Sequence, residues 1–242
     1  TFGYAFAKHD GDSVRRRAAI ATYSEVYHDF PYLNKDVRGV MSSMLFENEG
    51  YFRMKYYDYV DDVVPERFAS GQTNGNRTNF PLMRYADVLL LYAEAVCMSG
   101  EGTANISGLE ALNKVRRRAG LTDAPALDMD NAEYGIKAER RFELWLEDCS
   151  RYVDLIRWGD YKKFITDTSI DGVSEHWGNE CAWLVGLKDA TKRTTDPTDW
   201  SNYEVRYDPL STRGTWSDRF YLWPFPYAET TQNPNLDQNT GW

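Results

Sequence analysis

The sequence predicts a mainly α-helical protein with long irregular loops, folded as one domain over residues 1–242. An apolar helical pattern at 81–100 and a capped, shorter helical pattern ending at Gly120 support the helices. Turn-forming residues without a clear period dominate 166–242, and they support the loops. We therefore expect a helical core over 81–165 and a loop-rich part over 166–242.

The strongest helical signal is PLMRYADVLLLYAEAVCMSG, residues 81–100. Proline suits the first turn of a helix and glycine its end, so Pro81 and Gly100 mark the expected limits. Apolar side chains fall on nearly all sides of this helix, which predicts that it is buried between neighbours. The narrow polar strip that remains consists of Arg84, Asp87 and Glu94.

A second helix follows after a short connection. Ser107 and Glu110 have the spacing of a capping box, and Gly120 ends the apolar pattern. Because the connection is only a few residues long, the two helices are expected to pair antiparallel as a hairpin over 81–120.

A third helix is expected to begin near Asp130 and to run past Cys149 to about Phe164. A stripe of mixed charge follows one side of it, and the interleaved signs predict a structural ion-pair network. Its members are Glu139, Arg140, Glu143, Glu147, Arg151, Asp154 and Arg157. A carboxylate metal site is disfavoured, because helical di-iron sites use Glu-x-x-His pairs and the nearest histidine is His176.

The first 79 residues show little sustained periodicity, apart from a helix expected to start at Ser13 and extend to Tyr27. The triplets 15–17 and 116–118 are each three arginines and are expected on solvated helix faces. With 28 basic and 37 acidic residues, the net charge of −9 argues against nucleic acid as a partner.

The sequence offers little support for catalysis or for a cofactor. It lacks a G-x-S-x-G nucleophile motif and a phosphate-binding glycine loop, although its many carboxylates do not exclude a glycosidase pair. The three cysteines have no metal-ligand spacing. Residues 167–172 imitate the opening of a calcium loop, but position 178, where the closing acid belongs, is glycine. We therefore expect residues 167–172 to form a polar turn without calcium. For the chain as a whole, we expect neither a metal nor a cofactor.

Aromatic residues make up 15% of the chain. Rings with a polar group suit sugars, whose C–H faces stack on rings while their hydroxyls form hydrogen bonds. Aromatics in irregular segments are the candidates for such a ligand site, although each could equally pin down its own loop. The candidates are Tyr23, Tyr27, Tyr32, Tyr51, Trp177 and Trp183, and Trp200 and Trp216 are further candidates.

The chain closes with YLWPFPYAETTQNPNLDQNTGW, residues 221–242. Pro224 and Pro226 exclude a helix or a central strand through the first part of this tail. Four aromatics in seven residues would be an aggregation hazard if they were free, so we expect the tail to dock onto the body of the protein.

Four segments together resemble the second half of SusD/RagB-like outer-membrane lipoproteins. They are RYADVLLLYAEA (84–95), ALNKVRRRAGL (111–121), ERRFELWLEDCSRYVDLIRWG (139–159) and the tail. The resemblance implies tetratricopeptide-like helical hairpins and a non-enzymatic role. That role is the capture of glycans at the cell surface for a SusC-like TonB-dependent transporter. It further implies that the tail aromatics pack on the helices and that ligand contacts fall between Tyr23 and Tyr51.

The resemblance is to a longer family, which begins with a lipoprotein signal, an acylated cysteine and further helix pairs. We therefore expect this chain to be the C-terminal half, with the lipid anchor on the other half, at the outer-membrane surface. Two alternatives stay open. One is a carbohydrate-active enzyme that uses a carboxylate pair, and the other is a helical scaffold that binds only its transporter.

Overall fold

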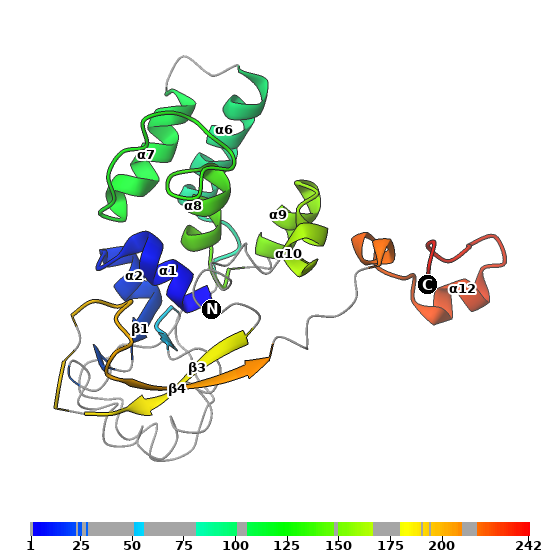
Figure 1. Ribbon diagram of the computed structural model, residues 1–242. Coiled ribbons are helices and arrows are strands. Elements are labelled where there is room, and N and C mark those ends of the chain that lie inside the picture. Colours follow the sequence, from blue (N-terminus) through cyan, green and yellow to red (C-terminus); the bar gives the residue numbers. More distant parts are fainter. Residues whose placement is uncertain are drawn as a thin grey trace.

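The computed structural model describes residues 2–22, 24–25, 28, 51–55, 81–100, 106–147, 150–166, 180–189, 191–193, 195–209 and 217–242. This part of the chain is mainly helical, which confirms the predicted fold class. In Figure 1, helices α6 (Tyr85–Ser99), α7 (Gly108–Arg118) and α8 (Ile136–Glu143) lie on one side of α1 (Phe2–Asp10) and α2 (Val14–Ala19). Two small strand pairs lie on the other side of α1 and α2.

The predicted hairpin of α6 and α7 is confirmed. The Ser107 hydroxyl accepts a hydrogen bond from the backbone N–H of Glu110 at 3.0 Å, and α7 begins at that cap. Gly100 ends α6 in the left-handed conformation, with φ of 74°. The helix begins at Tyr85 and not at Pro81, because Arg84 is extended, with φ −120° and ψ 156°.

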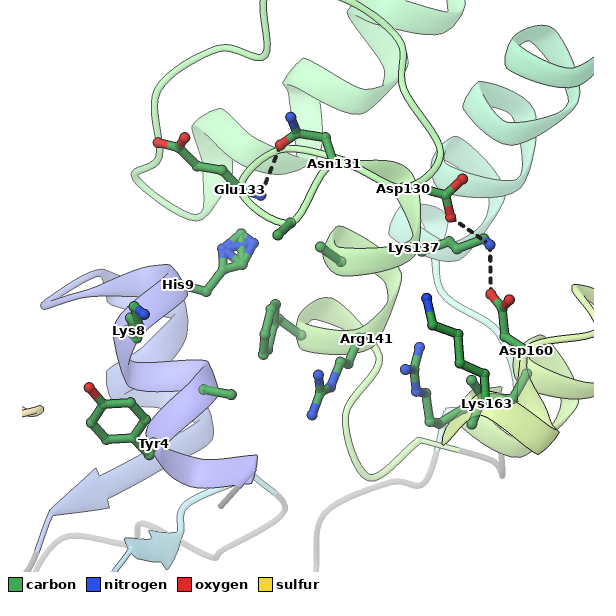
Figure 2. A pocket seen from close by; sticks show the side chains of 16 residues that line it. Tyr4, Lys8, His9, Asp130, Asn131, Glu133, Lys137, Arg141, Asp160 and Lys163 are labelled. Atoms are coloured by element: carbon green, nitrogen blue, oxygen red, sulfur yellow. Dashed lines mark hydrogen bonds and ion pairs between the residues drawn. The ribbon is translucent and has the colours of Figure 1, made fainter. Parts of the chain in front are cut away.

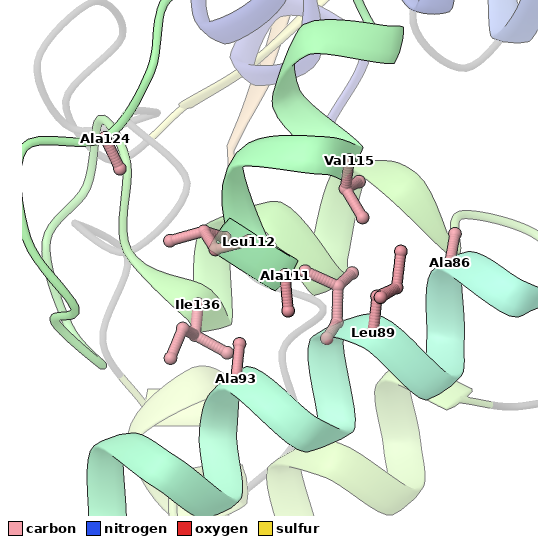
Figure 3. Close-up of a cluster of buried hydrophobic side chains, with 9 residues drawn as sticks. Ala86, Leu89, Ala93, Ala111, Leu112, Val115, Ala124 and Ile136 are labelled. Carbon is pink, nitrogen blue, oxygen red and sulfur yellow. The ribbon is translucent and has the colours of Figure 1, made fainter. Parts of the chain in front are cut away.

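The main hydrophobic core lies where α6, α7 and α8 meet (Figure 3). Leu90, Leu112 and Ile136 contribute one fully buried side chain from each helix. Each such side chain contributes about 1.5–3 kcal/mol relative to an exposed position. The cluster consists of Ala86, Leu89, Leu90, Ala93, Ala111, Leu112, Val115, Ala124 and Ile136.

The prediction that α6 is buried on all sides is wrong. Helices α7 and α8 pack on one side of α6, and apolar residues on its outer side are exposed. Tyr85 is 68% exposed and Met98 is 73% exposed, with Val88 and Leu91 between them. An apolar pattern around a helix shows which side chains could be buried. Which of them are buried depends on the elements that pack against the helix.

The predicted third helix is three helices, α8, α9 (Ser150–Arg157) and α10 (Tyr161–Thr166). Helix α8 ends at Glu143, and the following turn contains Leu146 with φ of 61°, a left-handed conformation that a helix cannot contain. Gly159, with φ of 73°, separates α9 from α10. The charged stripe therefore bends through space and does not follow one helical face.

Helix α8 also begins later than expected, at Ile136 and not near Asp130. The Asn131 side-chain oxygen accepts hydrogen bonds from the backbone N–H groups of Glu133 (2.9 Å) and Tyr134 (3.0 Å). This local pairing gives the backbone an alternative to the helix, which is how asparagine favours turns.

The N-terminal part combines helices with a short strand. Ser13 caps α2 as predicted, accepting from the N–H of Arg16 at 3.1 Å, but α2 ends at Ala19 and does not reach Tyr27. The chain then extends into β1 (Ile20–Thr22), which pairs antiparallel with β2 (Tyr51–Arg53). β-Branched residues at both ends of β1 favour a strand. Helix α1 has no counterpart in the sequence-based prediction.

The segment after 166 contains an antiparallel hairpin of β3 (Glu180–Leu187) and β4 (Tyr203–Pro209). An irregularity falls between Leu184 and Gly186. A second buried cluster joins α1, β2 and α8 through Phe6, Tyr51 and Phe142. Trp200 packs against that cluster and lies 5.3 Å from the ring of Tyr4.

The closing segment contacts the body of the protein, as expected, but it does not bury its aromatics there. Trp223 is 75% exposed and Tyr227 is 82% exposed. The segment carries a 3-10 helix, η2 (Asp218–Tyr221), and α12 (Tyr227–Gln232), and Figure 1 shows it set apart from α6 and α7.

The tail closes largely on itself. The Gln238 side chain bonds both backbone groups of Phe225, at 2.7 and 2.9 Å, and the Trp242 indole N–H donates to the Leu222 carbonyl at 2.9 Å. Its contact with the helices includes Trp223, whose ring lies 6.4 Å from that of Tyr152 on α9. These internal bonds satisfy the backbone without burying the rings.

Candidate functional site

A pocket of about 620 Å³ opens between α1, the turn at 130–134, α8 and the α9–α10 region (Figure 2). Small-molecule sites in proteins commonly have volumes of this size. Its apolar wall includes Tyr4, Phe142 and Leu155, and Asn131 adds a polar side chain. The turn that carries Asn131 is the one that delays the start of α8, so the local sequence shapes the pocket wall directly.

Cationic side chains outnumber acidic ones around this pocket. The cations are Lys8, Lys137, Arg141, Arg151 and Lys163, and the acids are Asp130, Glu133 and Asp160. Lys137 pairs with both Asp130 and Asp160, at 2.7 and 2.6 Å. Its ammonium group is therefore held between two carboxylates at the pocket wall.

Two of the cations lie over aromatic rings. The guanidinium of Arg141 lies 5.4 Å from the ring centroid of Phe142, and that of Arg151 lies 5.7 Å from that of Phe164. Stacking of this kind restricts a long side chain and engages the flat face of the guanidinium, whereas its N–H donors lie in the plane.

His9 lies at the inner edge of the pocket, with its Nε2 3.1 Å from a carboxylate oxygen of Glu139. Burial lowers the pKa of His9 to about 4. The imidazole is therefore neutral at pH 7 and adds no charge to the lining. Its ring meets the edge of Phe142, with the centroids 4.4 Å apart.

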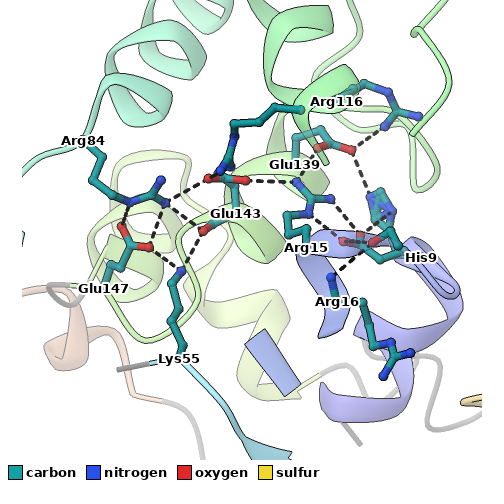
Figure 4. A network of polar contacts seen from close by, with 12 residues as sticks. His9, Arg15, Arg16, Lys55, Arg84, Arg116, Glu139, Glu143 and Glu147 are labelled. Carbon is teal, nitrogen blue, oxygen red and sulfur yellow. Dashed lines mark hydrogen bonds and ion pairs between the residues drawn. The ribbon is translucent and has the colours of Figure 1, made fainter. Parts of the chain in front are cut away.

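Behind the pocket lies a buried network of ion pairs (Figure 4). Glu139, which is fully buried, accepts from Arg15 at 2.9 Å and also from Arg116. Glu143 accepts from Arg84 at 2.9 Å. Further pairs join Arg15 to Asp10 and Glu143, Arg118 to Glu143, and both Arg84 and Lys55 to Glu147.

The other predicted network members join α6 to α8 and α9. Arg140 pairs with Asp154 and with Asp87, both at 2.8 Å. Arg157 pairs with Asp154 at 2.8 Å and with Glu94. The predicted Glu139, Arg140, Glu143, Glu147, Asp154 and Arg157 thus all make ion pairs, while Arg151 lines the pocket.

The expectation that both arginine triplets are solvated is wrong. Arg15, Arg16 and Arg116 are buried, at 8%, 0% and 4% exposure. Arg16 pairs with Glu25 at 2.6 Å. The sequence could not reveal these roles, since Arg15 and its partner Glu139 are separated by 124 positions.

Few of the predicted ligand-binding aromatics can be compared with this geometry. Tyr23, Tyr27, Tyr32, Trp177 and Trp216 lie outside the described residues. Trp183 stands in β3, paired in register with Arg206.

Tyr51 is placed in the second core cluster. It is 6% exposed, its hydroxyl donates to the Pro197 carbonyl at 2.8 Å, and the Trp200 indole N–H donates to it at 3.3 Å. Tyr51 is therefore a core residue and is not among the proposed ligand contacts.

Two further features concern metals and membranes. Within the described ranges, the acids, histidines and cysteines form no group of three or more that could hold a metal ion. The calcium-like segment 167–172 lies outside those ranges. No helix among the described residues has the length and apolar character needed to cross a bilayer.

Comparison with known proteins identifies the family. The model of the SusD family matches residues 4–242. The chain belongs to the SusD family. A SusD-like protein of Bacteroides ovatus is 28% identical over 166 residues, which are 66% of this chain and 29% of that protein.

A solved structure agrees. The crystal structure of a SusD-like protein from Bacteroides fragilis matches 80% of this chain and 30% of its own, with 26% identity and a TM-score of 0.50. The chain thus spans less than a third of the length of these relatives.

The pocket residues themselves were not found from the sequence. Lys8 and Lys163 lie in short helices far apart in the chain, and neither carries a motif. One signal was present: Lys137 and Arg141 are four residues apart on α8, as are Glu139 and Glu143, so a helix places the two pairs on different faces.

Proposed function

We propose that this SusD-family chain binds oligosaccharides without cleaving them, as the ligand-capturing part of a nutrient-uptake system. The observation that carries the proposal is the family match over residues 4–242. The pocket beside α8 supports it, because its volume and mixed polar and apolar walls suit a few sugar rings.

The pocket favours binding over catalysis. Two of its three carboxylates, Asp130 and Asp160, are both held by the ammonium of Lys137. Glycosidase chemistry requires a pair of carboxylates aimed at the glycosidic bond from opposite sides. These two acids instead bridge the turn at 130–134 to the start of α10, and so they fix the pocket wall.

The proposed setting is the surface of the outer membrane, where the chain would pass its ligand to a SusC-like TonB-dependent transporter. The family match supports this proposal for both the location and the partner. Exposure of intact cells to a protease that cannot enter them should degrade a surface protein, and protection would contradict the location.

The experiment that tests the proposal uses end-labelled oligosaccharides of several backbones and the 242-residue chain. Binding is measured by fluorescence anisotropy, and the recovered ligand is separated by chromatography. We expect saturable binding of at least one ligand, recovered intact. Shortened products would support the enzyme alternative. Silence across the panel, with retention of the transporter on immobilised chain, would support the scaffold alternative.

A further inference from the structure

From the exposed apolar side of α6, we infer that this helix is the docking surface for a further amphipathic helix of the same polypeptide, outside these 242 residues. The surface, which we call the outer face of α6, consists of Tyr85, Val88, Leu91, Ala95 and Met98. All five residues are exposed, Tyr85 at 68% and Met98 at 73%. The inference goes beyond the proposed function and does not depend on which ligand the chain binds.

The first argument is the spacing of these residues. Val88, Leu91, Ala95 and Met98 follow one another at intervals of three, four and three residues. Apolar residues at alternating intervals of three and four form the seam through which one helix packs against another. Tyr85 lies three residues before Val88 and lengthens this seam towards the start of α6. The outer face therefore has the pattern that suits a second helix.

The second argument is that α6 has two apolar faces. Ala86 and Ala93 belong to its inner face, which packs into the core with α7 and α8 (Figure 3). Val88 and Ala95 follow these two residues by two positions each, a step that turns a helix by roughly 200°. The two faces therefore point in nearly opposite directions. A helix that is apolar on opposite sides suits a place between two neighbours, and α7 and α8 supply the neighbours on one side.

The third argument is how helical hairpins stack. A stack of hairpins buries a continuous core and needs a polar outer surface at each end. The acidic side chains of α6 do not lie on the outer face, because Asp87 and Glu94 pair with Arg140 on α8 and with Arg157 on α9. The outer face of α6 is therefore apolar, which is typical of a hairpin inside a stack. Contiguous apolar patches of this kind mark interaction surfaces.

The size of the outer face decides between a separate partner and a linked one. Helix α6 has 15 residues, so the face is about 22 Å long and about 10 Å wide. A stable complex between separate proteins needs much more, about 800 Å² per partner. Two copies of this chain would also repel each other, since each carries a net charge of −9. A helix in the same polypeptide has a high effective concentration and can dock on a smaller area.

The length of the relatives leaves room for such a helix. This chain spans less than a third of the two SusD-like relatives, so most of each relative lies outside the matched part. A longer polypeptide of this family can therefore contribute helices that these 242 residues do not contain. The occupant of the outer face is accordingly an amphipathic helix with an apolar seam, supplied by the rest of a longer chain.

The test measures how fast hydrogen peroxide oxidises Met98, a reaction that needs access to the sulfur. Peptide mass spectrometry gives the rate for each methionine separately. The 242-residue chain is compared with the protein purified as a single polypeptide from the cells that produce it. Met98 should react freely in the 242-residue chain and at least about tenfold more slowly in the natural protein, where a packed neighbour excludes the reagent. Met54, which is 1% exposed, is the internal reference and should react slowly in both.

Two valine substitutions test whether the outer face is responsible. Val88→Glu places a charge in the seam, whereas Val153→Glu makes the same change at an exposed valine on α9. In the natural protein, Val88→Glu should speed the oxidation of Met98 at least about fivefold, because a buried unpaired charge drives the docked helix away. Val153→Glu should leave the slow rate unchanged. Met54 should stay protected in both variants, which shows that the core is intact.

The other outcomes overturn the inference. Slow oxidation of Met98 in the 242-residue chain would show that this chain covers the face by itself. Fast oxidation in the natural protein would show that the face is free, and protection that appears only in a dimer would assign it to a second copy. Equal effects of the two valine substitutions would show that the outer face is not responsible. Oligosaccharide binding is measured separately, so the proposed function stands or falls independently of this test.

Discussion

Removal of the Glu139 carboxylate tests whether the buried ion pairs hold the fold together. Glu139 lies at the centre of the network, fully buried, with Arg15 and Arg116 as partners. Glu139→Ala leaves both guanidinium groups, which are 7% and 5% exposed, without this carboxylate. Arg15 retains Asp10, at 2.6 Å, so part of its charge stays compensated.

The magnitude follows from burial. Breaking a buried ion pair by removing one partner costs about 3–5 kcal/mol, because the remaining charge cannot be solvated. For a chain of this length, that cost corresponds to a fall of about 6–20 °C in the melting temperature. The lost packing of the Glu139 side chain acts in the same direction.

The assay is unfolding in urea and by heat, followed by circular dichroism. Asp123→Ala is the matched control, since Asp123 is a carboxylate that pairs with Arg117 at 3.0 Å, but both side chains are about half exposed. We expect the control to lose less than about 1 kcal/mol. Equal stability of the two variants would refute the reasoning, because burial would then have no effect on the cost.

Three further predictions use the same unfolding assay. Arg157→Ala should cost about 1–3 kcal/mol, since Arg157 is one-third exposed while its partner Glu94 is buried, and a melting curve like that of the parent would contradict this. His9 has a folded pKa of about 4 against an ordinary 6.5, so the stability it contributes is complete above pH 6.5 and is lost towards pH 4. That loss, about 3 kcal/mol, should be absent from His9→Gln, and parallel pH profiles would disprove the assignment. Gly135→Ala should cost about 1–3 kcal/mol, because a Cβ there would collide with the backbone of Asn131, and an unchanged midpoint would show that the turn yields freely.

Short-range signals in the sequence located the helical hairpin. The Ser107 cap and the Gly100 and Gly120 ends act through neighbouring backbone groups, and the structure shows all three as expected. The prediction of one long third helix was wrong because no such local signal marks its break. The left-handed conformation of Leu146 cannot be recognised from the residue type. A prediction from periodicity alone therefore merged α8, α9 and α10 into one helix.

Long-range features could be predicted only in part. The acidic residues of the ion-pair network were found from their spacing, but partners such as Arg15 and Lys55 come from distant segments. The pocket also depends on residues far apart in the sequence, because its cationic side chains come together only in the folded chain. The tail aromatics are exposed while side chains such as Gln238 bond the tail backbone internally, and hydrophobicity alone does not predict this arrangement.

The central claim is that this SusD-family chain binds an oligosaccharide and leaves it intact. The most direct measurement is a calorimetric titration of the 242-residue chain with its best ligand, followed by mass analysis of the ligand recovered after prolonged incubation. The account predicts a saturable isotherm and a recovered ligand of unchanged mass. A ligand shortened by hydrolysis, or no heat of binding with any oligosaccharide, would contradict it.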